Sequence, residues 1–358
     1  MVDWTKSMQQ TFEYYIVDPN TWADVKPLTN VRSCDISRDL DVDTLGSASI
    51  DMTSDSNGLS KIGENYIRVY LITNQNGVTE KHPLGTFLIQ TPSTNFNGKI
   101  TNLLIDAYTP LLELKEKQPP LGYSLLKDSN IMDNAYLITR EQCRAPVVKP
   151  ECSKTLHNDF VSSDRDTWIT FNQDLIANAE YEYSLDEISR ILFSPIQDTA
   201  SLQPVWTYDD DNSSILYPDI DMKHDLYKIP NVVEIIYSSG KDNYHARVVN
   251  DDPNSPTSIT NRGREIVYRE INPSLSGRPT EQQIKEYAEN QLRKLSSLEY
   301  TITYTHGYCP VRIGDCVRLN YVRAGIVDVK AKVISQQIKC KPGCEVTEKA
   351  VFTKKLWG

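Results

Sequence analysis

Apolar and polar residues alternate along most of the chain from residue 1 to about residue 110. In residues 47–53, for example, Ala48, Ile50 and Met52 alternate with serine, aspartate and threonine. Successive side chains of a strand point to opposite faces, so these three apolar residues share one face. The pattern predicts a strand with one buried and one polar face.

A hairpin is predicted next. Residues 66–72 form an apolar run that leads to Asn76-Gly77, and a second run follows at 85–90. Asn-Gly suits a two-residue hairpin turn because both positions take a positive φ. A strand at 100–107 then runs into a short helix at 111–117. The whole block is therefore predicted to be a small antiparallel barrel or sandwich closed by a helix.

The pattern is mixed between residues 118 and 230. Apolar residues recur at helical spacing in 131–138, after polar residues that can cap a helix. A capping-box sequence predicts a second helix over 184–193. Residues 203–208 and 215–218 are predicted to pair as a hairpin around the polar run between them.

The strand pattern resumes at residues 231–250 and again from residue 300 to the end. Between them, a capping box at Thr280 begins a predicted helix with one apolar face over 280–295. Val327, Val329, Ala331 and Val333 alternate with charged residues, which predicts a strand with one core face. Strand blocks at both ends of the chain, around a mixed centre, hint at two related barrels.

Composition and charge exclude several classes of protein. The chain has 358 residues, more than one hydrophobic core usually supports, so two to four compact units are expected. Its net charge of -10 argues against a nucleic-acid reader but suits the wall of a conduit for DNA. No apolar run is long enough to cross a bilayer, and the start of the chain does not resemble a secretion signal. The 20 tyrosines are typical of a large oligomer interface or of an aromatic binding surface for carbohydrate.

Seven cysteines are an odd number for a complete set of intrachain disulfides, and free thiols are favoured. Cys309, Cys316, Cys340 and Cys344 lie beside two turns, which leaves zinc as an alternative, although their spacing is not that of a zinc knuckle. A disulfide formed between hairpin cysteines after release from the cell is a third possibility.

One acidic run resembles a calcium loop only in part. Asp209, Asp211 and Ser213 match the first three ligand positions of an EF-hand. Ser214 stands at the position of the required glycine, and Ile220 at that of the bidentate glutamate. A solvated turn is therefore favoured over a calcium site.

The sequence contains no catalytic motif that stands out. The five histidines are scattered without metal-ligand spacing, and there is no nucleophile elbow and no phosphate-binding glycine loop. Asp219 and Asp221 leave glycosidase chemistry as a minor alternative. We therefore expect no enzyme, no cofactor and no metal site.

A resemblance appears in the later part of the chain. The sequence Asp252-Pro253-Asn254-Ser255-Pro256 is followed by Gly263-Arg264, a helix with an Ala-x-x-x-Leu pattern, and a turn at Gly314-Asp315 before a valine. This order resembles the tail hub proteins of phages with long tails. Leu84-Gly85-Thr86 and the strand running into 108–114 resemble the first barrel of the same family.

The resemblance implies a mainly β fold with α+β insertions: two antiparallel barrels like those of the tail tube, and two smaller mixed α/β domains. We expect the first barrel at 1–117, a mixed domain at 118–230, the second barrel at 231–250 together with 300–358, and a small loop-helix domain at 251–299.

It also implies the function of a hub subunit in the tail of the virion, assembled in the host cytoplasm. Three copies would form a pseudo-six-fold ring that joins the tail tube to the central spike and passes DNA. The expected partners are other copies of the chain, the tube or distal tube ring, the spike, the tape-measure protein and wedge or distal-tail subunits. Because the chain ends at Gly358, soon after the second barrel, we expect a separate spike and favour a contractile tail.

Structural roles are expected for a small set of residues. Pro253 and Pro256 would stiffen the loop that also contains Ser255, and Asp252 and Arg264 would fix it electrostatically. Gly85, Gly263 and Gly314, with Asp315, would serve tight turns. Two other functions remain as alternatives, a cell-wall or glycan-degrading tail enzyme and a receptor-binding module.

Overall fold

A computed structural model describes residues 2–54, 65–96, 98–211, 214–224, 229–239, 242–273 and 280–355. The chain divides into two compact units. Unit 1 comprises residues 1–220 and 303–350, and unit 2 comprises residues 221–302 and 351–358. No helix among the described residues is long and apolar enough to span a membrane.

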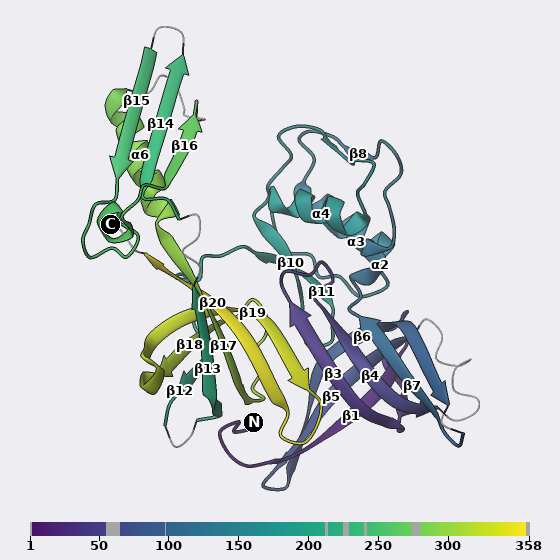
Figure 1. Cartoon of the computed structure of the whole chain (residues 1–358). Coiled ribbons are helices and arrows are strands. Elements are labelled where there is room, and N and C mark those ends of the chain that lie inside the picture. The colour runs from purple at the N-terminus through teal and green to yellow at the C-terminus, as the bar shows by residue number, and fades with distance from the viewer. Residues whose placement is uncertain are drawn as a thin grey trace. The chain divides into compact units, whose positions relative to one another are not determined.

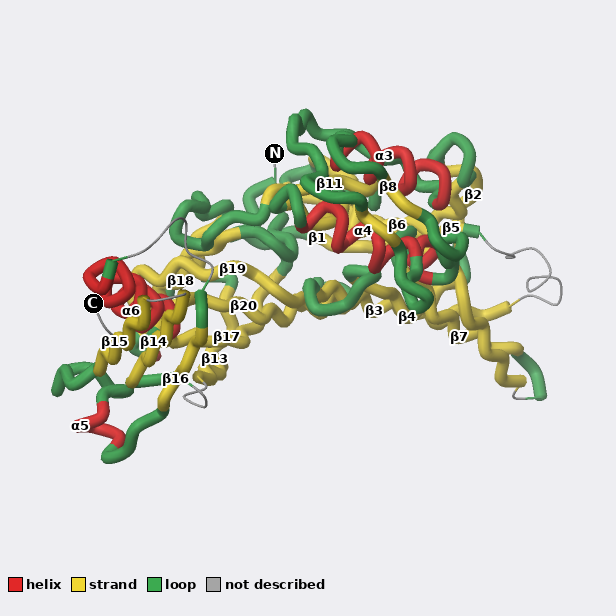
Figure 2. The backbone as a smooth tube through the Cα atoms, turned by 90° about the horizontal axis from the view of Figure 1, so that it is seen from above, coloured by secondary structure: helices red, strands yellow, loops and turns green. Residues whose placement is uncertain are grey.

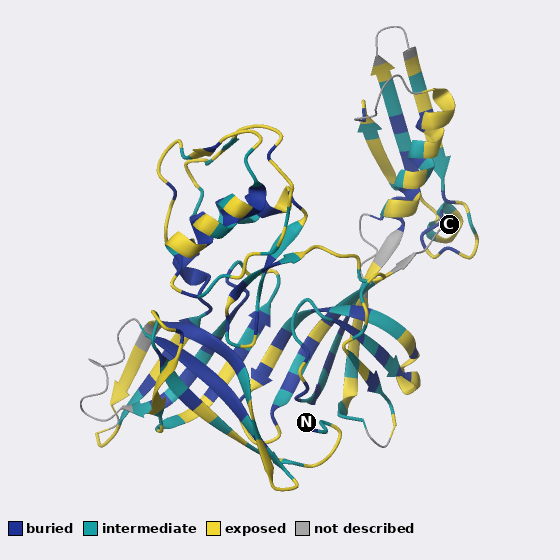
Figure 3. Cartoon of the chain, turned by 180° about the vertical axis from the view of Figure 1, so that it is seen from behind, coloured by how far each residue is buried: buried dark blue, intermediate teal, exposed yellow. Residues whose placement is uncertain are grey.

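The first barrel is built from the first seven strands (Figure 1). These are β1 (Gln9–Val17), β2 (Asp24–Leu28), β3 (Val31–Asp39), β4 (Gly46–Ser54), β5 (Tyr66–Gln75), β6 (Val78–Phe96) and β7 (Thr101–Tyr108). They lie in the order β3-β4-β7-β6-β5-β1-β2. Their inner faces carry a continuous buried core that includes Ile50, Val69 and Ile105, seen as dark blue strands in Figure 3.

The second barrel repeats this arrangement with six later strands. These are β12 (Trp206–Asp209), β13 (Leu216–His224), β17 (Ser297–Gly307), β18 (Cys316–Tyr321), β19 (Ile326–Lys339) and β20 (Glu345–Lys355). Their order, β13-β17-β20-β19-β18-β12, matches β3-β4-β7-β6-β5-β1 both in space and along the chain. One difference is that β12 runs parallel to β18, whereas β1 runs antiparallel to β5. The expected pair of related barrels is confirmed.

A mixed domain lies between β7 and β12 in the sequence. Its elements are α2 (Leu112–Lys115), β8 (Ser124–Leu125), α3 (Ile131–Gln142), β9 (Phe160–Val161), α4 (Trp168–Ala177), β10 (Tyr181–Leu185) and β11 (Ile191–Pro195). Apolar side chains of α3 and α4 share one core with Val17, Tyr66 and Leu88 of the first barrel, so the domain packs directly on that barrel. Figure 2 shows α3 and α4, in red, beside β8 and β11.

The described residues of unit 2 include a three-stranded sheet and two helices. They are β14 (Val232–Ser239), β15 (Asp242–Val249), α5 (Ile259–Arg262), β16 (Val267–Ile271) and α6 (Glu281–Leu295). β14 pairs antiparallel with β15 and parallel with β16. Ile284, Ala288 and Leu292 of α6 pack on Val233 and Ile235 of β14, so the predicted apolar face of this helix covers the sheet.

Several local predictions are confirmed. Asn76 and Gly77 have φ values of 53° and 81° and join β5 to β6 in a hairpin. Ala48, Ile50 and Met52 are buried on one face of β4. The helix predicted at 131–138 is α3, and the one predicted at 280–295 is α6, with the capping box of Thr280 and Gln283 formed.

Two local predictions are wrong. Residues 184–193, predicted as a helix, form parts of the antiparallel strands β10 and β11 and the turn between them. In this turn the Asp186 carboxylate accepts hydrogen bonds from the backbone N–H groups of Ile188 and Arg190. These local bonds stabilise the turn in competition with a helix. The hairpin predicted within residues 203–218 does not form, since β12 pairs with β18 and β13 with β17.

The expected division into domains also needs correction. Residues 231–250 form β14 and β15 of unit 2 and are not part of the second barrel. Their place in that barrel is taken by β12 and β13, which were expected in the mixed domain. The physical reason is that a strand's local pattern does not specify a partner about 100 residues away.

The strand predicted at 327–333 is part of β19, but its alternation holds only in its second half. Ala331 and Val333 are buried, whereas Val327 is 61% exposed. Asp328 has a φ of 53°, and the register of β18 against β19 shifts in this region. The resulting bulge turns the first residues of β19 out of the core.

Gly85 was expected in a tight turn and instead lies within β6, at a shift in its register against β5. Its φ is 146°, and a Cβ there would lie 2.7 Å from the Phe87 ring. We expect Gly85→Ala to lower the free energy of unfolding by about 1–3 kcal/mol, because the backbone and the ring must both shift.

Chemical denaturation measures this effect. Gly307→Ala is the matched control, because a Cβ there has no neighbour within 4 Å. Equal stability of the two variants would contradict the assignment of strain to Gly85.

Candidate functional site: the joint between the barrels

The two barrels of unit 1 are joined edge to edge. Residues 335–339 of β19 pair antiparallel with residues 39–35 of β3, in five consecutive pairs. Ile36 and Ile338 face each other in this joint and are both buried, and the Gln337 amide donates a 2.6 Å hydrogen bond to Ser37 Oγ. Main-chain pairing makes the two barrels one continuous sheet.

The tip of the β19–β20 hairpin extends this joint onto the first barrel. The N–H of Cys340 donates to the Cys34 carbonyl at 2.9 Å, and that of Gly343 donates to Gln10 Oε1 at 3.0 Å. Cys340, Cys344 and Val346 belong to the same buried core as the first barrel's own side chains. The second barrel therefore fills part of the first barrel's core.

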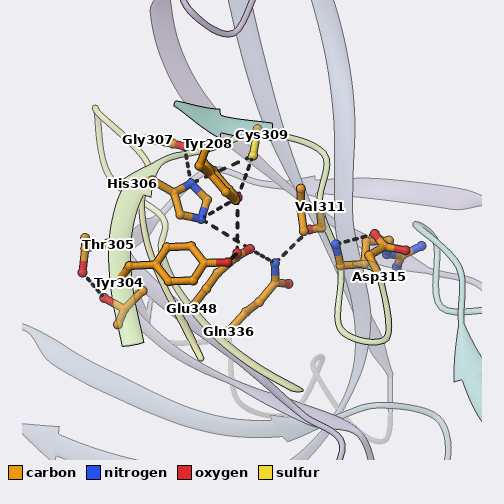
Figure 4. Close-up of polar contacts among 12 residues, drawn as sticks. Tyr208, Tyr304, Thr305, His306, Gly307, Cys309, Val311, Asp315, Gln336 and Glu348 are labelled. Atoms are coloured by element: carbon orange, nitrogen blue, oxygen red, sulfur yellow. Dashed lines mark hydrogen bonds and ion pairs between the residues drawn. The ribbon is translucent and has the colours of Figure 1, made fainter. Parts of the chain in front are cut away.

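A buried polar network lies next to the joint (Figure 4). Glu348 of β20 is at its centre and is 0% exposed. Its carboxylate accepts from Tyr304 at 2.8 Å and from Tyr208 at 3.2 Å, and lies 3.3 Å from His306 Nε2. It also accepts from Gln336, so four donors from three strands, β12, β17 and β19, converge on one carboxylate.

The network reaches the first barrel through Arg38 of β3. This buried guanidinium donates to Gln336 Oε1 at 2.9 Å and to the Leu84 carbonyl at 2.7 Å. The chain Arg38–Gln336–Glu348 therefore links the two barrels by side chains as well as by the backbone. Such a fully satisfied buried network fixes one arrangement of the strands that meet in it.

The charges in the network stabilise each other. Burial opposes the charge on His306, but the Glu348 carboxylate and the hydrogen bonds to Glu348 and Cys309 raise its pKa to about 10. Burial would raise the pKa of Glu348, but His306 and the neighbouring donors hold it below its usual range. Burial, with a contribution from Arg312, lowers the pKa of Arg38 to about 10. All three groups are therefore charged at neutral pH.

A cavity of about 510 Å³ opens beside the joint, between the first barrel, the β10–β11 hairpin and the turn that precedes β18. Two ion pairs lie in its lining: Arg312 lies 3.1 Å from Glu187, and Lys332 lies 3.3 Å from Glu182. These pairs fasten the β10–β11 hairpin to the second barrel. Burial raises the pKa of Asp315, which also lines the cavity.

The structure brings three of the predicted site residues together and separates them from the others. Gly85, Gly314 and Asp315 all line this cavity. Gly314 has a φ of 90° in a turn in which Asp315 Oδ2 accepts from the Arg312 N–H, so a tight turn is present there as expected. Asp252, Pro253, Ser255, Pro256, Gly263 and Arg264 lie in unit 2.

In unit 2 the Pro-rich loop is held by uncharged side chains. Buried Ser255 accepts from the Asn250 amide at 2.9 Å, and the Asn261 amide donates to the carbonyls of Pro253 and Ser255, each at 2.8 Å. Gly263 ends α5 with a φ of 61°. The loop therefore has a defined conformation that depends on amide and hydroxyl groups.

An ion pair between Asp252 and Arg264 is not part of this arrangement within the described residues. Asp252 accepts instead from the backbone N–H of Asn254 at 2.8 Å, and Arg264 contributes its backbone carbonyl to the Asn231 amide. The expectation that the two charges fix the loop is corrected accordingly.

Asn261→Ala is expected to speed proteolytic cleavage within residues 250–258 about tenfold. The variant leaves two carbonyls without the amide donor and lowers the free energy of loop opening by roughly 1.4 kcal/mol. Timed limited proteolysis of the folded chain measures the rate. Arg264→Ala is the control, because its backbone carbonyl remains, and it should cleave at the wild-type rate.

All seven cysteines are free thiols in the structure. Burial raises the pKa of Cys143, Cys316 and Cys344, so these thiols stay protonated at neutral pH. No group of three or more acidic, histidine or cysteine side chains among the described residues could hold a metal ion. Of the partial calcium loop, Ser213 lies outside the described residues, and Asp209 accepts a hydrogen bond from Asn320.

Sequence reasoning missed the buried network. One signal was present: His306 continues the inward face of Ile302 and Tyr304, and Glu348 lies between Val346 and Ala350 on the inward face of β20. An ionisable residue at an apolar position of an alternating strand indicates a buried partner. The link to the first barrel was not predictable, because Arg38 and its partner Gln336 lie 298 residues apart in the chain.

The fold is shared with solved phage tail proteins. The tail protein from Neisseria meningitidis superposes with a TM-score of 0.62 at 13% identity, over 97% of this chain and 98% of that one. The 43 kDa tail protein of prophage MuSo2 from Shewanella oneidensis gives 0.60 at 10% identity, over 95% and 98%. This chain has the fold of these phage tail proteins.

A third solved structure with a similar fold comes from a secretion system. The E. coli protein c3393, a type VI secretion component with structural similarity to the T4 tail proteins gp27 and gp5, gives a TM-score of 0.54 at 9% identity, over 96% of this chain and 78% of that one. No protein-family model and no curated protein matches the chain by sequence. The tail-hub fold was nevertheless predicted from short motifs, and its mainly antiparallel β class is confirmed.

Proposed function

We propose that this chain is a structural hub subunit of a phage tail or a phage-tail-like particle, and that three copies form a ring of six barrels. The observation that carries the proposal is the pair of barrels with one strand order, joined edge to edge within one chain. Three such chains present six similar barrels to a six-fold tube and three identical faces to a three-fold spike.

The proposed place of the chain is the distal end of the virion tail. The hub would join the tail tube, or a distal tube ring, to the spike, hold the tape-measure protein until its release, and pass DNA through the ring. The net charge of -10 supports this role, because an acidic bore repels DNA and does not retain it. Wedge or distal-tail subunits would contact the outside of the ring.

A catalytic role for the most enzyme-like cluster is disfavoured by its burial. Cys309, His306 and Glu348 are the residue types of a thiol-protease triad, and Cys309 Sγ lies 4.0 Å from His306 Nδ1. Their exposed fractions are 2%, 0% and 0%, and His306 Nδ1 lies 2.6 Å from the Gly307 carbonyl. Substrate cannot reach the thiol, and the nitrogen nearest to it is engaged by a backbone acceptor.

Mass measurement of the purified chain, followed by electron microscopy, tests the proposal. A trimer with six barrel-like lobes around a channel is the expected result. A monomer at all concentrations would overturn the proposed ring. Peptidoglycan lysis by the purified chain would favour a cell-wall enzyme, and specific binding on a glycan array would favour a receptor-binding module.

A further inference from the structure

The β10–β11 hairpin has one covered edge and one open edge. On the outer side of β11, the N–H of Ile191 donates to the Pro146 carbonyl, and its carbonyl accepts from the Val148 N–H, each at 2.9 Å. Residues 146–148 therefore cover the edge of β11. β10 pairs with β11 alone among the described strands, so its other edge is open.

The ladder shows which backbone groups point to the open edge. Residues of an antiparallel strand alternate between those that exchange hydrogen bonds with the partner strand and those whose backbone groups point outward. Glu180 and Asp186 hydrogen-bond through the backbone to the residues that flank β11. In steps of two, residues 182 and 184 also bond to β11, so the N–H and C=O groups of Tyr183 and Leu185 point away from it. Ile191, which is paired with Leu185, points its own groups outward in the same way.

These outward groups have no partner in the part of the chain that the structure describes. Outside the ladder, no backbone or side-chain group there forms a hydrogen bond with the backbone of Tyr183 or Leu185. Tyr183 is only 3% exposed. Buried N–H and C=O groups are paired in nearly all folded proteins. Two sets of such groups, two residues apart along a strand, match the repeat of another extended chain.

The cavity of about 510 Å³ beside the joint reaches this edge. From β11 it is lined by Leu192 and Ser194, which share one face, and by Pro195 at the strand end, whereas from β10 it is lined by the successive residues 182–185. One face of a strand presents only every second residue, so a cavity that contacts successive residues extends around the edge. Its volume lies within the range of ordinary ligand pockets.

The charges beside β10 are balanced. Three carboxylates of the hairpin that line the cavity each have a cationic partner: Glu182 pairs with Lys332, Asp186 with Arg190 and Glu187 with Arg312. A charged group that entered here would lose its hydration without gaining an unpaired counter-charge. Apolar side chains of the first barrel, including Leu45, Leu84 and Phe87, also line the cavity. The lining therefore favours an uncharged segment with apolar side chains.

We propose that the open edge of β10 is a strand-addition site for an extended, uncharged segment of another protein, with apolar side chains at alternate positions. The segment exchanges main-chain hydrogen bonds with Tyr183 and Leu185 and places its apolar side chains against those of the first barrel. The described strands of this chain are already paired in its own sheets, which favours another protein as the source. The inference does not depend on the proposed ring.

A pool of displayed, uncharged pentapeptides, selected on the folded full chain, supplies the probe. A selected peptide should slow hydrogen exchange at the Tyr183 and Leu185 amides about tenfold or more, because both gain an acceptor. Exchange at Ser184 should not change, because its amide already belongs to the ladder. A pool that yields no binder overturns the site, and so does a bound peptide that slows exchange at neither edge amide.

N-methylation of the selected peptide at alternate residues separates main-chain pairing from apolar contact. The N–H groups of a strand point in turn to its two sides, so one methylated set loses the donors that face β10 and the other set keeps them. We expect the first set to bind about tenfold or more weakly, and the second to bind like the unmodified peptide. Equal affinity of the two sets would overturn strand addition.

Leu185→Pro tests the edge on the chain itself. Proline lacks the N–H and is tolerated at an edge where that group does not serve the ladder. Leu185→Val keeps the N–H and is the matched control. We expect the peptide to bind about tenfold or more weakly to Leu185→Pro and about as tightly as wild type to Leu185→Val, with circular dichroism showing that both are folded.

The same two variants identify the outcomes that contradict the proposal. Equal loss of peptide binding in both variants would overturn the role of the Leu185 N–H. Self-association of the wild type that disappears in Leu185→Pro would assign the edge to a second copy of this chain and overturn its assignment to another protein. None of these results bears on the ring of barrels, which mass measurement tests separately.

Discussion

Glu348→Ala is expected to lower the free energy of unfolding of unit 1 by about 3–5 kcal/mol. The substitution removes the acceptor shared by Tyr208, Tyr304 and Gln336 and leaves the buried His306 cation without its partner. Removing one member of a buried ion pair is costly because the remaining charge has lost its solvation and gained nothing in return. A change of this size is a large part of the stability of an ordinary domain.

Guanidinium unfolding followed by tryptophan fluorescence measures the loss. Glu345→Ala is the control on the same strand, since Glu345 pairs with Lys339 at the surface. Exposed pairs contribute up to about 1 kcal/mol, so the control should unfold near the wild-type midpoint. If Glu348→Ala and Glu345→Ala unfold at the same guanidinium concentration, the network does not contribute to the stability of the barrel.

Raising the pH from 7 to 8.5 is expected to lower the stability of the wild type by about 2 kcal/mol through His306 alone. The folded pKa of this histidine is about 10, above its ordinary value of 6.5. Its contribution is therefore complete below pH 6.5 and is lost as the pH rises from 6.5 through 10. Within this window the folded chain holds a proton that the unfolded chain has released.

Unfolding curves at several pH values between 7 and 8.5 measure this slope. In His306→Asn the contribution is absent, so the stability of the variant should fall less steeply by about 1.4 kcal/mol per pH unit. The difference between the two slopes isolates His306 from the cysteines, which also titrate in the unfolded chain. Parallel slopes would show that His306 is neutral in the folded protein.

Local chemistry predicted local structure well. The Asn76-Gly77 turn, the alternating face of β4 and the capping box of α6 each depend on neighbouring residues and are all confirmed. The β10–β11 hairpin was mistaken for a helix because a capping sequence also suits a turn in which Asp186 accepts backbone hydrogen bonds. Here the hydrogen-bonded turn forms instead of the predicted helix.

The pairing of strands that lie far apart in the chain could not be predicted from the sequence. β14 and β15 have a strand pattern as good as that of β12 and β13, and only the pairing of β12 with β18 and β13 with β17 shows which pair belongs to the barrel. The buried network could not be predicted for the same reason, because Arg38 and Gln336 lie 298 residues apart in the chain.

Three of the nine residues for which structural roles were expected, Gly85, Gly314 and Asp315, line the cavity at the joint.

The pairing of β3 with β19 has a consequence for synthesis. During translation β3 emerges early, and its partner β19 emerges only roughly 300 residues later. Until then the first barrel has an open edge and lacks the apolar side chains that the β19–β20 hairpin adds to its core. Nascent chains on neighbouring ribosomes are thus exposed to mispairing at this edge, so slowing elongation late in the message should raise aggregation more than slowing it early.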